Sequence, residues 1–89
     1  DFRLEIERRE AEKKFEKLRD DIVEFANELA LRETVSSEWV ENTYRKINYY
    51  HNLQNKYHFE NDQATISIEV IKQKYQEMLL KGQITRKDD

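Results

Sequence analysis

Cysteine and proline are absent from this chain of 89 residues, and glycine occurs once, as Gly82. Without cysteine the chain can form no disulfide, no thiolate nucleophile and no cysteine-based metal site. A β-rich domain of this length needs turn residues about every dozen positions, and glycine and proline are too scarce to supply them. The sequence therefore predicts an all-α fold.

Long apolar runs are absent too. No stretch approaches the roughly 20 apolar residues that a membrane span needs, and no signal peptide is recognisable, so we expect no membrane contact and an intracellular, by default cytoplasmic, location. A net charge of −3 argues against a dominant phosphate-binding surface. Because the chain starts without methionine, we expect a single helical domain over residues 1–89 that is a fragment of a longer protein.

Charged residues make up 39% of the chain and hydrophobic residues 37%, which leaves material for only a thin core. Long helices with one apolar stripe suit this composition. Periodicity predicts a long helix over residues 2–33 and two shorter ones over 36–59 and 67–81, arranged as a helical hairpin or three-helix bundle. Ser36 and Ser67 are the predicted N-caps, and Gly82 is the predicted C-cap.

The long helix carries residues four and three apart that form the seam of a coiled coil or bundle helix. The seam consists of Leu4, Arg8, Ala11, Phe15, Leu18, Ile22, Phe25 and Leu29. Its apolar stripe is narrow up to Leu18 and wider from Ile22, which predicts that the N-terminal half projects as a coiled coil and the C-terminal half lies in a local bundle. We predict that Leu4, Ala11, Phe15 and Leu18 contact a partner and that Arg8, the polar exception, sets the register.

The predicted partner is a second copy of the chain or another helical protein. In a parallel homodimer Lys14 would face Arg19, a pair of like charge. An antiparallel pairing centred between Phe15 and Leu18 instead places Lys14 opposite Asp21, so the flanking charges favour the antiparallel homodimer.

An intramolecular alternative is that the two shorter helices cover the seam. The second helix is about 24 residues, or roughly 36 Å, so it cannot reach the N-terminal end of the first. Phe2, Leu4 and Ile6 are therefore expected to stay uncovered by the chain itself.

Aromatic residues crowd the segment "NYYHNLQNKYHF" at 48–59. On a helical wheel most of the rings in the second helix fall on the apolar side, and we predict that they are core. That side comprises Trp39, Thr43, Ile47, Tyr50, Leu53 and Tyr57. Tyr49 and Phe59 are predicted to point away from it.

Around Tyr49 the spacing places Arg45, Asn52 and Lys56 in one row. Aromatic and arginine side chains are enriched at protein-binding hot spots, and the same groups can stack on bases and contact phosphates. This row is a candidate protein-binding face or nucleic-acid-binding face, and the plain alternative is a solvated helix surface.

Residues with the spacing of a catalytic or metal site were not found. His51 and His58 are seven apart, about 10.5 Å along a helix, too far to share one metal ion. There is no phosphate-binding glycine loop. We therefore expect no catalytic residue, metal, cofactor or small-molecule ligand. The sequence favours a non-catalytic helical module for protein–protein interaction, oligomerisation or scaffolding, with a nucleic-acid-binding accessory domain or a ligand-free spacer as alternatives.

Overall fold

The computed structural model describes residues 1–60 and 63–86. It consists of α1 (Phe2–Leu31), β1 (Val35–Ser36), α2 (Ser37–Tyr57), α3 (Gln63–Leu80) and β2 (Ile84–Thr85). The predicted all-α class, with one long N-terminal helix and two shorter ones, is confirmed. The molecule is elongated, 52 × 27 × 17 Å.

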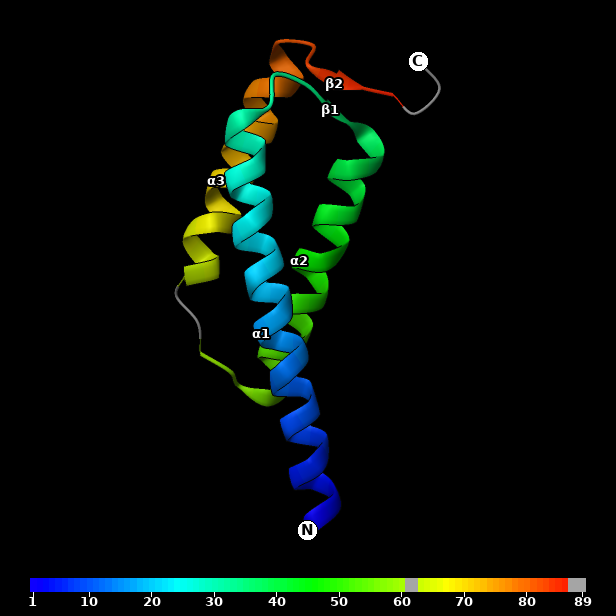
Figure 1. Ribbon diagram of the computed structural model, residues 1–89, viewed down its shortest axis with the longest axis vertical. Coiled ribbons are helices and arrows are strands. Elements are labelled where there is room, and N and C mark those ends of the chain that lie inside the picture. The colour runs from blue at the N-terminus through cyan, green and yellow to red at the C-terminus, as the bar shows by residue number, and fades with distance from the viewer. Residues whose placement is uncertain (61–62, 87–89) are drawn as a thin grey trace.

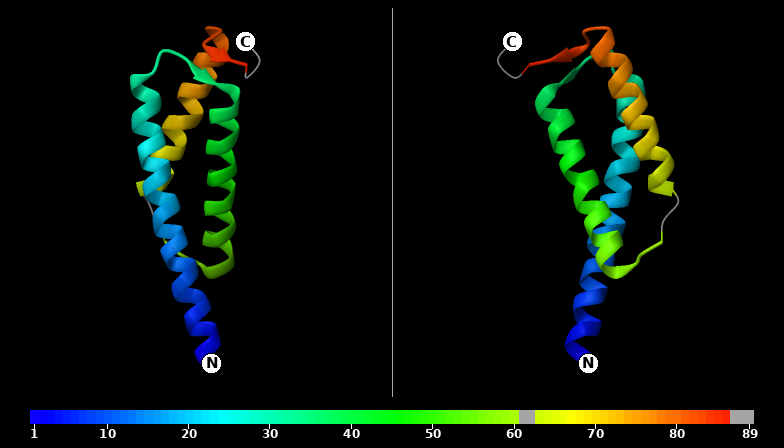
Figure 2. Two further views of the ribbon diagram at one scale, coloured as in Figure 1. Left: turned by 45° about the vertical axis from the view of Figure 1, so that its right-hand side comes forward. Right: turned by 180° about the vertical axis from the view of Figure 1, so that it is seen from behind.

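α1 is the central element and contacts both other helices. α2 runs back antiparallel to α1, and α3 then runs in the same direction as α1 (Figures 1 and 2). At about 1.5 Å per residue the 30 residues of α1 span about 45 Å, which accounts for most of the long dimension. The first turns of α1 extend beyond the end of α2 in every view.

The core is built from the stripes that the periodicity indicates. All three helices contribute buried apolar side chains to a single cluster. Its members from α1 are Phe15, Ile22, Ala26 and Leu29, from α2 Val40, Ile47 and Tyr50, and from α3 Ala64, Ile68, Ile71 and Met78. Thr43 is buried among them and donates its hydroxyl to the carbonyl of Trp39 at 2.9 Å, so its polar group is satisfied.

Helix α2 begins where the sequence predicts. The hydroxyl of Ser36 accepts the backbone N–H of Trp39 at 3.1 Å, the bond that an N-cap makes. Its end differs: the helix stops at Tyr57 rather than 59, because His58 adopts the left-handed conformation with φ of 57°. The chain reverses there.

That reversal makes one prediction wrong. Phe59 was expected to point away from the apolar side, but it packs against the core cluster, with its ring centroid 4.9 Å from that of Phe15. The helical wheel assumed that the helix continues through residue 59, whereas the left-handed His58 turns the next side chain inward.

Helix α3 begins earlier than predicted, at Gln63 rather than 67, so Ser67 lies inside the helix and is not its N-cap. The buried residues Ala64, Ile68, Ile71 and Met78 follow helical spacing from the first turn, and packing against α1 overrides the local start signal. α1 also ends two residues early, at Leu31.

The predicted C-cap is confirmed. Gly82 has φ of +68°, its N–H donates to the carbonyl of Leu79 at 3.2 Å, and the N–H of Gln83 donates to that of Met78 at 2.8 Å. This pair of bonds is the Schellman motif. It directs the chain into a short parallel bridge that the sequence did not predict, in which Val35 pairs with Ile84.

Candidate functional site

The first turns of α1 carry apolar side chains that nothing in the described chain covers. Phe2 is 75% exposed, Leu4 63% and Ile6 41%. We call residues 2–6 the tip. Its exposure confirms the prediction that the second helix is too short to cover this end, and the tip projects past α2 at the bottom of Figure 1.

The tip joins the bundle through a polar and aromatic contact at the end of α2. The guanidinium of Arg8 donates to the carbonyl of Tyr57 at 3.0 Å and lies 5.1 Å from the ring centroid of Phe59. The Tyr57 hydroxyl donates in turn to the carboxylate of Glu7 at 2.9 Å. A cation is favoured at the C-terminal end of a helix, where carbonyl groups lack helical partners. Arg8 therefore aligns α1 with α2 of the same chain.

Further along the seam the predicted contact residues lie inside the molecule. Ala11 and Phe15 are buried, and Leu18 is half-buried. The ring of Phe15 stacks on that of Tyr50 with centroids 4.4 Å apart and an interplanar angle of 13°. An antiparallel pairing centred between Phe15 and Leu18 would need α2 to move away. Of the predicted seam contacts, Leu4 and Arg8 stay exposed in the folded chain, and Leu4 is the apolar one of the two.

The row on α2 is exposed as its spacing indicates. Arg45, Tyr49, Asn52 and Lys56 all lie on the surface, with Tyr49 46% exposed. The members of the row lie at two different places, however. Arg45 and Tyr49 line a groove between α1 and α2, whereas Lys56 lies near the tip, with its ammonium 3.8 Å from the carboxylate of Glu7.

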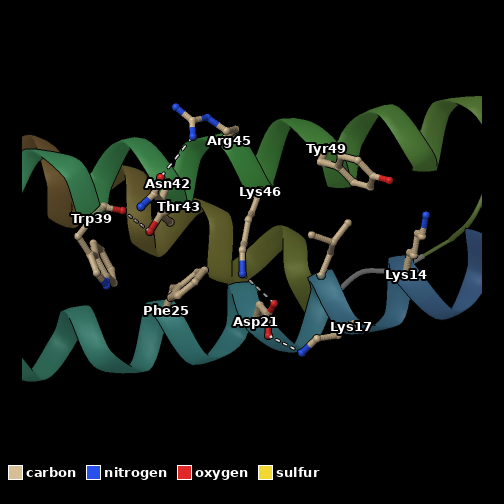
Figure 3. A pocket seen from close by; sticks show the side chains of 11 residues that line it. Lys14, Lys17, Asp21, Phe25, Trp39, Asn42, Thr43, Arg45, Lys46 and Tyr49 are labelled. Carbon is tan, nitrogen blue, oxygen red and sulfur yellow. Dashed lines mark hydrogen bonds and ion pairs between the residues drawn. The ribbon is translucent and has the colours of Figure 1, made fainter.

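The groove between α1 and α2 has a volume of about 670 Å³. From α1 it is lined by Lys14, Lys17, Leu18, Asp21 and Phe25. From α2 it is lined by Trp39, Asn42, Thr43, Arg45, Lys46 and Tyr49. Figure 3 shows Phe25 and Trp39 towards one end and Lys14 and Tyr49 towards the other.

One ion pair crosses the groove. The ammonium of Lys46 on α2 lies 3.1 Å from the carboxylate of Asp21 on α1, and that carboxylate is also 3.6 Å from the ammonium of Lys17 (Figure 3). Lys46 additionally lies 5.3 Å from the ring centroid of Phe25. The Phe25 ring meets that of Trp39 edge-on, with centroids 5.5 Å apart. These contacts connect the two walls of the groove.

The groove combines an apolar floor with a cationic rim. Its lining holds four cationic side chains and one carboxylate, although the whole chain has a net charge of −3. An occupant with acidic and apolar groups is therefore matched in charge and polarity. The heptad pattern of α1 does not indicate the groove, because residues from two helices form it. The available signal in the sequence was the pairing of aromatic with cationic residues on both helices.

An aromatic contact also joins α2 to α3. The rings of Tyr44 and Tyr75 meet edge-on with centroids 5.7 Å apart. Burial raises the pKa of the Tyr44 hydroxyl above its usual value, and the neighbouring Tyr75 raises it further.

The described residues form neither a metal-binding cluster nor a membrane-spanning helix. Within residues 1–60 and 63–86, no group of three or more His, Asp or Glu side chains is placed to hold a metal ion. No helix in the described part of the chain combines the length and apolar character needed to cross a bilayer.

No protein-family model, curated protein or solved structure matches the chain.

Proposed function

We propose that this chain is a non-catalytic helical module for protein–protein interaction or oligomerisation, and that the tip of α1 forms part of its contact surface. One observation carries the proposal: Phe2, Leu4 and Ile6 are exposed on a helix that projects beyond the rest of its own domain. Burying a large apolar side chain contributes about 1.5–3 kcal/mol. A second helix laid against the tip would supply that burial.

The arrangement at the base of the tip supports this proposal. Arg8 and Glu7 both form hydrogen bonds with Tyr57 at the end of α2, so the base of the projecting part of α1 is anchored to the bundle. A contact surface on an anchored helix loses less conformational entropy on binding than one on a free segment.

The test measures mass in solution by light scattering over a range of concentrations. We expect the wild-type chain to self-associate, and the triple variant Phe2→Ser, Leu4→Ser, Ile6→Ser to stay monomeric with its bundle intact by circular dichroism. A matched control changes the exposed apolar residues Ile66 and Val70 of α3 to serine. A wild-type chain that is monomeric throughout, or a tip variant that associates equally well, would contradict the proposal.

A second candidate function is nucleic-acid binding by the Arg45, Tyr49, Asn52 and Lys56 row. The observation that favours it is the cationic rim of the groove beside exposed Tyr49, since cations and aromatic rings together suit single-stranded nucleic acid. Fluorescence anisotropy with a labelled single-stranded oligonucleotide tests it. Binding that strengthens as salt falls and weakens in Arg45→Glu and Lys56→Glu would support it, with Lys13→Glu as the off-row control.

A further inference from the structure

A row of charged residues follows α1 on the side that faces the groove. Spacings alternate between four and three, which keeps the side chains on one face of the helix. The charged row consists of Arg3, Glu7, Glu10, Lys14, Lys17 and Asp21. From the N-terminus the signs are plus, minus, minus, plus, plus, minus. Read backwards, every sign is inverted, so an identical row laid antiparallel meets an opposite charge at each position.

The same row forms one wall of the groove. Lys14, Lys17 and Asp21 line it, and the other three members continue along α1 towards the tip, beyond the groove. The half of the row outside the groove is mainly acidic, and the half inside it is mainly basic. Leu18 and Tyr49 provide apolar surface beside the basic half.

We propose that each groove is occupied by α1 of a second copy of this chain, running antiparallel, with Glu10 facing Lys14 and Glu7 facing Lys17 in both directions. This inference rests on the proposed function and specifies where the projecting helix binds. The facing pairs 10/14 and 7/17 place residues 2–6 of one copy beside residues 18–22 of the other. The tip therefore comes to lie beside Leu18 of the second copy, and the arrangement closes as a two-fold dimer.

This pairing differs from one through the apolar seam because it leaves α2 in place. Lys14 and Glu10 are exposed, the Lys17 side chain is 80% exposed, and that of Glu7 is 52% exposed. Phe15, by contrast, is covered by the chain itself. The α1 face is thus available in the folded monomer.

Charge complementarity selects this occupant. The groove offers four cations against one carboxylate, and the projecting part of the row offers Glu7 and Glu10. A neighbouring row on the outer face of α1 has Arg9 and Lys13 at its centre, and antiparallel pairing there would bring like charges together. The charges therefore favour the groove-side face over the outer one.

Charge reversal at the centre of the row gives the first test. Glu10→Lys alone places two lysines opposite each other in the homodimer, and Lys14→Glu alone places two glutamates opposite each other. We expect each variant to raise the dimer dissociation constant at least about tenfold, by sedimentation velocity at low salt. Mixing the two variants recreates opposite charges at every facing pair, so the mixture should dimerise as tightly as the wild type.

Lys13→Glu is the matched control, with the same charge change one residue away and off the row. Restoration in the mixture is a readout that a folding defect would not produce, and circular dichroism of each variant checks helicity separately. If both single variants lose the dimer and their mixture does not regain it, the groove pairing is overturned.

Disulfide trapping gives the register. A mixture of Glu7→Cys and Lys17→Cys chains should form a mixed disulfide dimer, because these positions face each other. In a parallel pairing the two positions are ten residues apart, about 15 Å, and could not be joined. Efficient Lys17→Cys homodimer trapping in place of the mixed dimer would overturn the register.

The outcomes separate the two proposals. A wild-type dimer that ignores the charge variants and gives no mixed disulfide overturns the groove pairing and leaves self-association through the tip standing. A wild-type chain that is monomeric at every concentration overturns both.

Discussion

For Phe15, a core role and a partner-binding role predict different results of the same substitution. The structure places it 3% exposed between Tyr50 and Phe59, with ring centroids 4.4 Å and 4.9 Å away. The perturbation is Phe15→Ala. If Phe15 is core, the variant destabilises the monomer, and if it is an interface residue on an exposed seam, the variant weakens association and leaves monomer stability alone.

The magnitude follows from burial. Truncating a fully buried phenylalanine to alanine lowers the free energy of unfolding by about 3–5 kcal/mol, since both the transfer free energy and the packing contacts are lost. Domains are stable by only about 5–15 kcal/mol in total. For a chain of this size each kcal/mol shifts the thermal midpoint by about 4–8 °C, so a drop of at least about 12 °C is expected.

The assay is thermal unfolding followed by circular dichroism, at a protein concentration low enough that the wild type is monomeric, because dimerisation would add its own stabilisation. Phe2→Ala is the matched control: it is the same chemical change at a residue that is 75% exposed, and it should change stability by less than about 0.5 kcal/mol. A Phe15→Ala midpoint within about 2 °C of the wild type would refute the core assignment.

Three further predictions concern the helix ends and the tyrosine pair. Ser36→Ala removes the N-cap of α2 and should lower the free energy of unfolding by about 1 kcal/mol in urea titration, with Ser37→Ala as the neighbouring control. Gly82→Ala should lower the free energy of unfolding by about 1–2 kcal/mol. A Cβ at this position meets no atom within 4 Å, so the effect comes from the φ of +68° alone, and Gly82→Asn should have a smaller effect. Because the folded-state pKa of Tyr44 is raised by burial and then by Tyr75, the protonated hydroxyl stabilises the fold at neutral pH. That stability is present below about pH 10 and is lost as pH rises through the folded pKa, so Tyr44→Phe should flatten the alkaline decline in the thermal midpoint. An equally steep decline in the variant would contradict this.

Local sequence determined much of the architecture. Alternating spacings of four and three predicted three helices and the apolar faces that carry Phe15, Ile22 and Tyr50, because side-chain direction along a helix follows from position alone. The two caps that the structure confirms were also readable, since Ser36 and Gly82 act through their own hydroxyl and backbone freedom. The exposed tip followed from comparing helix lengths.

Tertiary structure decided which helix covers which face. Periodicity marks a stripe as apolar but does not name its partner, so the sequence left open whether Phe15 meets a second copy or Tyr50 of its own chain. It also left open where Arg8 donates its hydrogen bond, and the answer, the carbonyl of Tyr57, depends on where α2 ends. The left-handed conformation of His58 brings Phe59 inward against Phe15.

The groove, too, was decided by the tertiary structure alone. Lys46 and Asp21 are 25 residues apart in sequence, and nothing in either segment indicates that they form an ion pair between α1 and α2. The signs along the charged row were present in the sequence from the start. The fold buries the apolar seam and leaves the charged row exposed. Only the tertiary structure therefore shows that these charges can select a partner, because a charge pattern acts on a partner only where the surface is accessible.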